Sequence, residues 1–230
     1  MLFFNLDERI RKMSTYAPQR KQVWQTTRWL SENGFFGSTL GSGGNVSMFD
    51  RKAEMVIITP SGKPYRQMSA EDICVVDPDM RQLAGTLPPS TETAMHIGIY
   101  RNRPDVNAVV HTHQPYASVF ALINKPIPAL FDEVTVELGA RIEIIPYAFS
   151  GSAELVANVQ RQTKNGANCY ILQNHGALNI GRDLTQAMRN AEMLEKVCQV
   201  YYRALCTGER ISRLPEAALQ HWMKLNIKNS

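Results

Sequence analysis

The chain of 230 residues lacks long apolar runs, and no stretch reaches the roughly 20 predominantly apolar residues of a membrane-spanning helix. It also lacks blocks of like charge: the basic residues are dispersed and the net charge is only +4, unlike the footprint of a nucleic-acid-binding protein. The N-terminus, Met1 to Lys12, has a short apolar start that Asp7 and Glu8 interrupt, so no secretory signal is expected. These absences predict a cytoplasmic protein without a membrane or nucleic-acid partner.

Cysteine is scarce, and the four cysteines form no Cys-x-x-Cys pair. Cys198 and Cys206 lie in one helical pattern and are too far apart for a disulfide if that helix is continuous. We therefore expect buried free thiols in a reducing compartment. The length and the hydrophobic content of 44% allow one sizeable core, and no internal repeat divides the chain. We predict a single domain over residues 1–230.

Two histidines end a strand-like segment. Residues 106–113 read Val-Asn-Ala-Val-Val-His-Thr-His, an apolar run that closes with His111 and His113. Alternate side chains of a strand share a face, so these imidazoles emerge together, about 7 Å apart along the backbone. His175 follows a second apolar run, residues 169–172, so three of the five histidines stand at strand exits. Three imidazoles with one open position are typical of catalytic zinc, although satisfied core or surface histidines would give the same pattern.

Two loops carry groups that suit an anion. Residues 41–47 read Gly-Ser-Gly-Gly-Asn-Val-Ser, in which glycines expose backbone N–H groups and Asn45 adds an amide donor. Residues 60–64 read Pro-Ser-Gly-Lys-Pro, a tight turn with a hydroxyl, a glycine and a lysine. A glycine-rich loop alone is a weak signal, because many such loops are simple turns.

A helix is predicted to begin within the segment Pro-Pro-Ser-Thr-Glu, residues 88–92. Ser90 or Thr91 is a candidate N-cap, and Glu92 then lies in the first turn, where the helix dipole favours a negative charge. That structural role alone would explain Glu92. The functional alternative places its carboxylate beside the metal, with the helix start around a phosphate. His96 lies one turn further on the same face, and we expect it to be a structural partner of Glu92.

The other elements follow from hydrophobic periodicity. Up to residue 78 the chain lacks the regular strand-helix alternation of a dinucleotide-binding fold. Strands are predicted over residues 54–59, 72–77, 106–113, 141–147 and 169–172, with Pro146 as an edge-type proline. Helices are predicted over residues 19–33, from 88–92 to 100, and over 116–122, 152–165, 183–207 and 214–225, with an irregular acidic segment at 127–133.

Five short motifs follow one another along the chain: Gly-Gly-Asn-Val-Ser (43–47), Ile-Thr-Pro-Ser-Gly (58–62), Pro-Ser-Thr-Glu (89–92), Val-His-Thr-His (110–113) and Asn-His-Gly (174–176). In this order they resemble the class II aldolase/adducin family, and its L-fuculose-1-phosphate aldolase branch in particular. The resemblance implies an α/β fold of three layers (αβα), with a mainly antiparallel central sheet and helices on both faces. It also implies a homotetramer with active sites at subunit interfaces.

The same resemblance implies an activity and a set of site residues. The activity is reversible cleavage of a ketose 1-phosphate into dihydroxyacetone phosphate and an aldehyde, through a metal-stabilised enediolate. His111, His113 and His175 would hold one divalent metal per subunit, typically Zn²⁺, with Mn²⁺ or Co²⁺ as alternatives. Glu92 would be the catalytic acid/base and an additional metal ligand. The residues implied for the substrate phosphate are Asn45, Ser61, Gly62, Ser90 and Thr91.

The sequence also departs from the family pattern. The family's fuculose-phosphate enzyme uses a tyrosine from the neighbouring subunit to protonate the aldehyde, and Asp132 stands at the matching position here. Asp132 or Glu133 could take that role. No tyrosine follows Tyr202, so a C-terminal tyrosine that helps to close the site in relatives is missing too. The proton donor and the aldehyde therefore stay unassigned.

Other activities of the family are open alternatives. A pentulose-phosphate 4-epimerase would form the same enediolate, but such enzymes often carry aspartate in place of Glu92. A dehydratase usually has Gly-Lys-Asp-Lys where residues 62–65 read Gly-Lys-Pro-Tyr, and a decarboxylase is a further alternative. Adducin-type members serve protein association and lack the metal histidines, so the intact histidines favour an enzyme over a binding module.

Overall fold

The computed structural model describes residues 16–38, 40, 41 and 43–229. The expectation for the N-terminus, residues 1–12, and Ser42 of the glycine-rich loop lie outside the described residues. Within these ranges, no helix combines the length and the apolar content that crossing a membrane would require.

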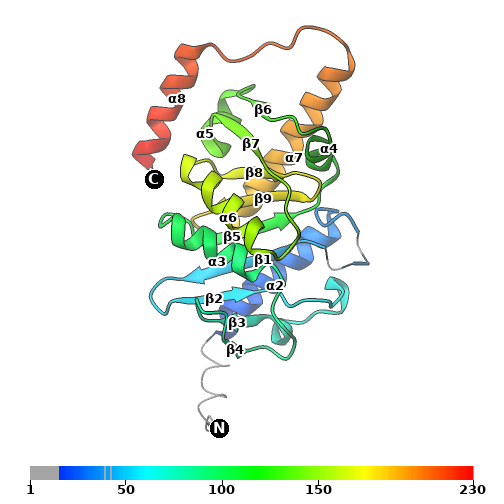
Figure 1. Cartoon of the computed structure of the whole chain (residues 1–230), viewed down its shortest axis with the longest axis vertical. Coiled ribbons are helices and arrows are strands. Elements are labelled where there is room, and N and C mark those ends of the chain that lie inside the picture. Colours follow the sequence, from blue (N-terminus) through cyan, green and yellow to red (C-terminus); the bar gives the residue numbers. More distant parts are fainter. Residues whose placement is uncertain (1–15, 39, 42, 230) are drawn as a thin grey trace.

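The centre of the structure is one mixed sheet of nine strands (Figure 1). Every neighbouring pair is antiparallel except β7 and β8, which run parallel. From one edge to the other the order is β4 (Gln82–Ala84), β3 (Cys74–Val76), β2 (Met55–Ile58), β1 (Asn45–Asp50), β5 (Ala108–Thr112), β9 (Gly176–Gly181), β8 (Cys169–Leu172), β7 (Arg141–Ile145) and β6 (Ile127–Pro128).

Helices cover both faces of this sheet. One face carries α3 (Thr93–Asn102) and α6 (Ala153–Gln162). The opposite face carries α2 (Ala17–Glu32), α4 (Pro115–Ile123), α5 (Asp132–Leu138) and α7 (Leu184–Cys206), and α8 (Glu216–Asn229) packs on α5. The described residues also form three short 3-10 turns: η1 (Tyr65–Gln67), η2 (Ala70–Asp72) and η3 (Thr163–Asn165). The three-layer α/β fold with a mainly antiparallel sheet is confirmed.

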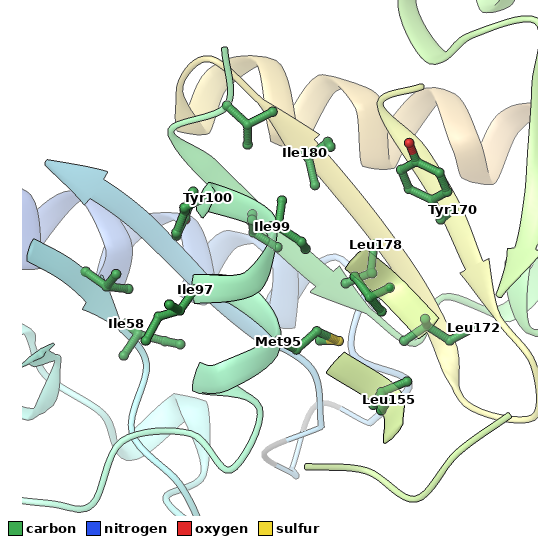
Figure 2. Close-up of a cluster of buried hydrophobic side chains, with 14 of the residues drawn as sticks. Ile58, Met95, Ile97, Ile99, Tyr100, Leu155, Tyr170, Leu172, Leu178 and Ile180 are labelled. Atoms are coloured by element: carbon green, nitrogen blue, oxygen red, sulfur yellow. The ribbon is translucent and has the colours of Figure 1, made fainter. Parts of the chain in front are cut away.

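Strand alternation explains why both faces of the sheet are buried. Val109 joins the core under α3 and α6, whereas its neighbours Ala108 and Val110 join the core under α2 and α7. Figure 2 shows the first of these cores, in which Met95 of α3 and Leu155 of α6 pack over the sheet. Burying apolar side chains on both faces stabilises the sheet by roughly 25 cal/mol for each Å² removed from water. A central strand such as β5 is therefore a rigid base for the residues at its end.

Side-chain caps begin two of the predicted helices. Ser152 accepts a hydrogen bond from the Leu155 N–H at the start of α6 (3.1 Å), and Asp183 accepts one from the Gln186 N–H at the start of α7 (2.8 Å). Each side chain satisfies a backbone donor that the first helical turn leaves free.

Four expectations about local structure were wrong. The segment 127–133 is not irregular, because it forms β6 and the start of α5. Asp132 and Glu133 lie in the first turn of α5, where their negative charges interact favourably with the helix dipole. Strand β7 lies between β6 and β8 rather than at an edge, and Pro146 follows its last residue. Glu92 itself is the N-cap residue of α3, so neither Ser90 nor Thr91 is. Cys206 is exposed at the end of α7, whereas the other cysteines are buried; all four are free thiols.

Candidate metal centre

The first histidine of the centre is fixed by the middle of the sheet. His111 lies on β5, which pairs with β1 on one side and β9 on the other, and its side chain is fully buried. Its Nδ1 lies 2.9 Å from the carbonyl oxygen of Ala177 on β9. That carbonyl can only accept, so Nδ1 carries the proton and donates it, which leaves Nε2 with a free lone pair. A backbone contact of this kind orients metal-ligating histidines.

The second and third histidines bring their rings against His111. His113 follows the end of β5, where its N–H donates to the Phe35 carbonyl oxygen over 2.8 Å, and its Nε2 lies 3.1 Å from Nε2 of His111. His175 lies in the turn between β8 and β9, after Asn174 in the left-handed conformation (φ 55°). Its ring centroid lies 4.8 Å from that of His111 and 5.3 Å from that of His113.

The three imidazoles converge closely enough to share a cation. Their nearest ligand nitrogens all lie within 4.8 Å of one another, and in the described part of the chain this is the one such group of histidine, cysteine and carboxylate ligands. Ligands at about 2.0–2.1 Å from a tetrahedral zinc ion stand roughly 3.3 Å apart, close to the observed 3.1 Å between the two Nε2 atoms of His111 and His113. The geometry that the sequence predicted for this histidine cluster is present.

Glu92 faces this cluster from the start of α3. One carboxylate oxygen, Oε2, lies 3.2 Å from Nε2 of His111, and the other, Oε1, lies 3.5 Å from Nε2 of His175. Asn45 of β1 donates through Nδ2 to Oε2 over 2.8 Å, and Ser150 donates through Oγ to Oε1 over 3.0 Å. The side chain does not cap its own helix. The purely structural interpretation of Glu92 therefore does not account for where its carboxylate points.

The donor set of the cluster fits a divalent cation. Because Nδ1 of His111 donates to Ala177, its Nε2 and the facing Glu92 oxygen are both acceptors, and a proton or a metal ion must lie between them. Burial and the neighbouring His111 lower the pKa of His113 to about 3 and that of His175 to about 4. Although burial opposes ionisation of Glu92, the His111 imidazole outweighs it and holds the pKa of the carboxyl well below its usual range. Although burial opposes protonation of His111, the Glu92 carboxylate outweighs it and raises the pKa of that imidazole. The neutral imidazoles of His113 and His175 and the ionised carboxylate of Glu92 are protonation states that suit a metal site.

Gly176, next to His175, has a packing role in the centre. A Cβ atom at this position would meet the backbone carbonyl oxygen of Thr112 first, and it would lie 2.6 Å from Cδ2 of His113 and 3.1 Å from Cε1 of His111. Any side chain larger than hydrogen would therefore displace the end of β5 and the two rings that it carries. This explains why glycine follows the histidine in the Asn-His-Gly motif.

The glycine-rich loop lies against the same strand end. A Cβ atom at Gly43 would lie 3.1 Å from Nδ1 of His113, and one at Gly44 would lie 2.6 Å from the His111 carbonyl oxygen. These glycines let the loop pass close to β5. Their first role is therefore to permit this packing, rather than to bind an anion. Asn45, directly after the loop, carries the side chain that reaches Glu92.

The two predicted phosphate-binding segments lie side by side. An isolated antiparallel bridge joins Pro60 to Pro89, the Ser61 N–H donates to the Pro88 carbonyl oxygen over 2.8 Å, and the Ser90 N–H donates to the Thr59 carbonyl oxygen over 3.1 Å. Ser61 and Gly62 therefore stand beside Ser90 and Thr91 at the start of α3. Ser90 is buried and its Oγ accepts the Glu92 N–H over 3.3 Å, whereas Gly62 and Thr91 are exposed.

Lys63, the basic residue of that turn, is already paired. Its Nζ lies 2.7 Å from Oδ2 of Asp72. The lysine of the turn therefore serves the local fold, and Ser61 and Gly62 remain the candidate anion contacts of this segment.

His96 has a different partner from the one expected. Its Nδ1 lies 2.6 Å from Oγ of Ser47, which also contacts the Tyr100 hydroxyl at 2.6 Å, so the partnership with Glu92 was wrong. The Ser47 hydroxyl comes from β1, which lies under α3. The His96 side chain contacts this hydroxyl rather than the Glu92 side chain one helical turn away. His96 is fully buried, and burial lowers its pKa to about 3, so the ring is neutral.

Two further residues differ from the sequence-based expectation. Ser150 was not singled out, although it touches Glu92, because no local motif marks it. Asp132, a candidate proton donor, instead accepts a hydrogen bond from Nε1 of Trp222 over 2.7 Å. In the described part of the chain, neither Asp132 nor Glu133 has a hydrogen bond or ion pair with Glu92 or the three histidines.

Comparison with known proteins gives concordant matches. The model of the class II aldolase and adducin N-terminal domain matches residues 21–202. A 5-deoxy-D-ribulose 1-phosphate aldolase of Bacillus thuringiensis is 34% identical over 82% of this chain and 87% of its own. An L-fuculose phosphate aldolase of Methanococcus maripaludis is 36% identical over 74% of this chain and 90% of its own. A solved structure of L-fuculose 1-phosphate aldolase superposes with a TM-score of 0.82 and 30% identity, covering 89% of this chain and 94% of its own.

Proposed function

Because this chain belongs to the class II aldolase and adducin family, we propose that it is a metal-dependent sugar-phosphate aldolase that cleaves a ketose 1-phosphate reversibly into dihydroxyacetone phosphate and an aldehyde. The observation that carries the proposal is the convergence of three imidazoles on one point, with the carboxylate of Glu92 facing them. The names of two relatives, a 5-deoxy-D-ribulose 1-phosphate aldolase and an L-fuculose phosphate aldolase, support this substrate class.

The metal is assigned to the histidine cluster. His111, His113 and His175 would hold one Zn²⁺ ion, with Mn²⁺ or Co²⁺ as alternatives, and Glu92 would be an additional ligand before substrate enters. When bound, the ion supplies a Lewis acid that stabilises negative charge on the carbonyl and hydroxyl oxygens of the ketose. Neutral histidine ligands suit this task, because they leave the positive charge of the ion undiminished.

Glu92 is assigned the proton transfer. Cleavage breaks the bond between the carbon next to the ketose carbonyl and the hydroxyl-bearing carbon that follows it. The hydroxyl on that second carbon loses its proton as the aldehyde leaves, and the electron pair of the broken bond stays on the dihydroxyacetone phosphate fragment. Glu92 then delivers a proton to the carbon next to the carbonyl, and in the direction of synthesis it removes the same proton. Its burial beside His111 and its two neutral donors, Asn45 and Ser150, hold the carboxylate in one orientation for this step.

The phosphate is assigned to the paired loops beside the helix start. Ser61, Gly62, Ser90 and Thr91 lie together next to the first turn of α3, whose N–H groups favour an anion. Asn45 completes the proposed phosphate site from β1. Phosphate contacts are remote from the bond that breaks, so they would supply binding energy and alignment.

The assembly and location are part of the same proposal. We expect a cytoplasmic homotetramer, and several large apolar side chains are exposed near the ends of β7 and α4, as at Leu122, Ile123, Tyr147 and Phe149. Light scattering coupled to size-exclusion chromatography would test the subunit number. The aldehyde-side proton donor stays unassigned, and Asp132 or Glu133 would have to come from a neighbouring subunit to serve.

One experiment tests the activity. The purified protein is analysed for bound metal and assayed with a panel of ketose 1-phosphates that includes L-fuculose 1-phosphate and 5-deoxy-D-ribulose 1-phosphate. The expected result is about one divalent ion per protomer and release of dihydroxyacetone phosphate with at least one substrate, which a chelator abolishes. An isomerised pentulose phosphate as the product, or no turnover across the panel with the metal bound, would contradict the proposal.

A further inference from the structure

Ser150 reaches the catalytic carboxylate from a loop that no sequence motif marks. The loop connects β7 to α6, and the Ser150 hydroxyl donates to Oε1 of Glu92 over 3.0 Å, across 58 residues of sequence. Asn45 holds the other oxygen, Oε2, over 2.8 Å. The Glu92 carboxylate is thus held by two neutral donors: Asn45 of β1 contacts one oxygen, and Ser150 of the β7–α6 loop contacts the other.

The loop that carries Ser150 is itself firmly anchored. Ala148 is buried in the core under α3 and α6, and the Tyr147 N–H donates to Oε1 of Gln173 over 3.2 Å. The Ser152 N–H closes a turn onto the Phe149 carbonyl oxygen over 3.0 Å. These contacts fix the backbone on both sides of Ser150, so the place of its Cβ atom does not depend on Glu92.

Gly151 lets this turn approach the start of α3. It has φ of 75°, and a Cβ atom there would lie only 3.0 Å from the carbonyl oxygen of Thr91, the residue before Glu92. The turn and the helix start are therefore in direct backbone contact. Ser150 is exposed, whereas Glu92 is buried, so the hydroxyl lies at the boundary between the carboxylate and the open side of the site.

We propose that Ser150 is a positioning residue for Glu92: its hydroxyl fixes the orientation of the carboxylate and sets the rate of proton transfer at the carbon next to the ketose carbonyl. The inference rests on the proposed function of the site. Ser150 would act through Glu92 and not on the aldehyde. Loss of the hydroxyl should therefore slow every step that uses Glu92, including steps in which no aldehyde takes part.

Proton exchange of dihydroxyacetone phosphate separates these roles. The holoenzyme, incubated in heavy water with dihydroxyacetone phosphate alone, should exchange the hydroxymethyl proton through Glu92, and NMR measures the rate. In Ser150→Ala we expect kcat for cleavage and the exchange rate to fall together by about tenfold, the size expected for one hydrogen bond to a charged group. The KM for the ketose phosphate and the metal content should stay within about twofold of wild type, because no phosphate contact or histidine changes.

Two further variants complete the test. Ser150→Thr keeps the hydroxyl and should restore both rates to within about threefold of wild type. Ser152→Ala removes a hydroxyl that caps α6 two residues later without touching Glu92, so it should leave exchange unchanged.

Four results would overturn the inference. Unchanged exchange in Ser150→Ala with slower cleavage would assign Ser150 to the aldehyde side instead. Equal losses in the alanine and threonine variants, or the same exchange defect in Ser152→Ala, would trace the effect to the backbone of the turn. A wild-type enzyme that neither exchanges nor cleaves would instead refute the proposed function, and this inference with it.

Discussion

Asn45 and His111 face each other across neighbouring strands, as partners in the antiparallel register of β1 and β5. Each extends a side chain to the same oxygen of Glu92: Nδ2 of Asn45 over 2.8 Å and Nε2 of His111 over 3.2 Å. The amide donates there, whereas His111 can contribute only through a shared proton or metal ion. A single cross-strand pair therefore places a neutral hydrogen-bond donor and a candidate metal ligand beside the same carboxylate.

An added charge at Asn45 should disable the proton transfer. Asn45→Asp keeps the shape of the side chain but places a second carboxylate against Glu92, and two such groups disfavour ionisation of each other. We expect kcat for cleavage to fall by at least about tenfold while the histidine cluster keeps its metal. Steady-state kinetics with metal analysis would check this. Asn33→Asp, the same change at the exposed end of α2, serves as the control, and equal activity of the two variants would contradict the assigned contact.

A methyl group at Gly176 should damage the metal centre. In Gly176→Ala the new Cβ would lie 2.6 Å from Cδ2 of His113, so the ring must move. We expect metal affinity to fall by roughly tenfold to a hundredfold, measured by competition with a chromogenic chelator, while circular dichroism still reports a folded chain. Gly98→Ala, whose Cβ position lies 3.2 Å from the flexible side chain of Gln160, is the matched control. Full metal affinity in the Gly176 variant would show that the rings are not constrained in this way.

His96 should prove structural, in contrast to the ligand histidines. His175→Ala removes one nitrogen of the cluster and should abolish stoichiometric metal binding. His96→Asn should keep the metal, but the loss of its 2.6 Å contact with Ser47 should lower the free energy of unfolding by about 1–2 kcal/mol. Metal analysis and urea unfolding of both variants provide the comparison. Loss of metal in the His96 variant at a pH where the protein stays folded would place His96 in the centre.

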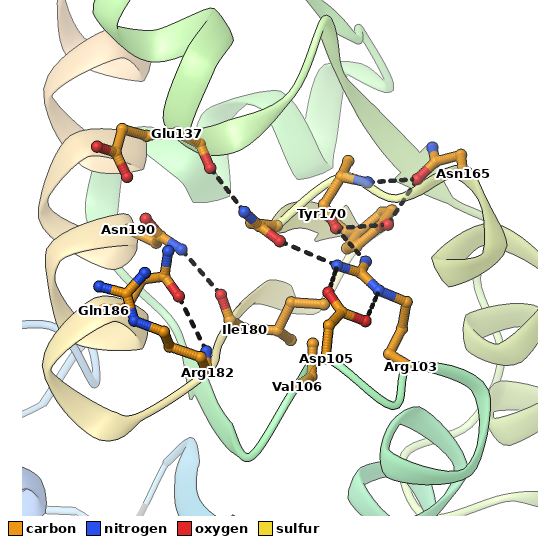
Figure 3. A network of polar contacts seen from close by, with 12 residues as sticks. Arg103, Asp105, Val106, Glu137, Asn165, Tyr170, Ile180, Arg182, Gln186 and Asn190 are labelled. Carbon is orange, nitrogen blue, oxygen red and sulfur yellow. Dashed lines mark hydrogen bonds and ion pairs between the residues drawn. The ribbon is translucent and has the colours of Figure 1, made fainter. Parts of the chain in front are cut away.

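An ion pair between the buried Arg103 and the exposed Asp105, at the turn into β5, should make stability depend on acid pH. Arg103 donates to Asp105 through Nε (2.8 Å) and Nη2 (2.6 Å), and also to the carbonyl oxygen of Ala167 (Figure 3). The hydrogen bonds from Arg103, against a smaller effect of burial, lower the pKa of Asp105 below its ordinary value. Since the folded pKa lies below the unfolded one, the pair stabilises the protein fully above the unfolded value near 4. That stability is lost as the pH falls through the folded pKa.

The test compares Asp105→Asn with wild type across the acid range. We expect the variant to be less stable by about 1 kcal/mol at pH 7, a figure reduced because Asp105 is partly exposed. The difference should shrink as the pH falls through the folded pKa of Asp105, because the wild-type carboxylate then becomes protonated too. Asp79→Asn, the same change in an exposed turn, is the matched control. A difference that stays constant with pH would mean that packing, not charge, explains the loss.

The candidate metal centre could be predicted from the sequence where a local pattern determines the direction in which a side chain points. His111 and His113 share a face because strand side chains alternate, and that period can be read from eight residues. The helices that begin after Ser152 and Asp183 were predictable for a similar reason, since each of these side chains accepts a hydrogen bond from the backbone N–H three residues ahead. The three-layer arrangement, by contrast, came from the order of five motifs and not from any one segment.

The errors lie where a distant element supplies the partner. Helical spacing placed His96 beside Glu92, but Ser47 on the strand beneath is nearer, and only the packing of α3 on β1 decides this. Ser150 contacts Glu92 across 58 residues, and a serine before a glycine reads as an ordinary turn. The start of α5 was missed because Asp132 and Glu133 look like a loop until the burial of Leu138 is known.

The candidate ligands come from three separate parts of the chain: the start of α3, the end of β5 and the turn between β8 and β9. A bound cation would therefore tie together segments that are remote in sequence, and the unfolded chain has no equivalent site. Any ligand that binds only the native state adds RT ln(1 + [L]/Kd) to stability, about 2.7 kcal/mol at a hundredfold excess over Kd. The melting temperature should then rise with the free metal concentration. The supply of the ion would therefore govern the stability of the protein as well as its catalytic activity.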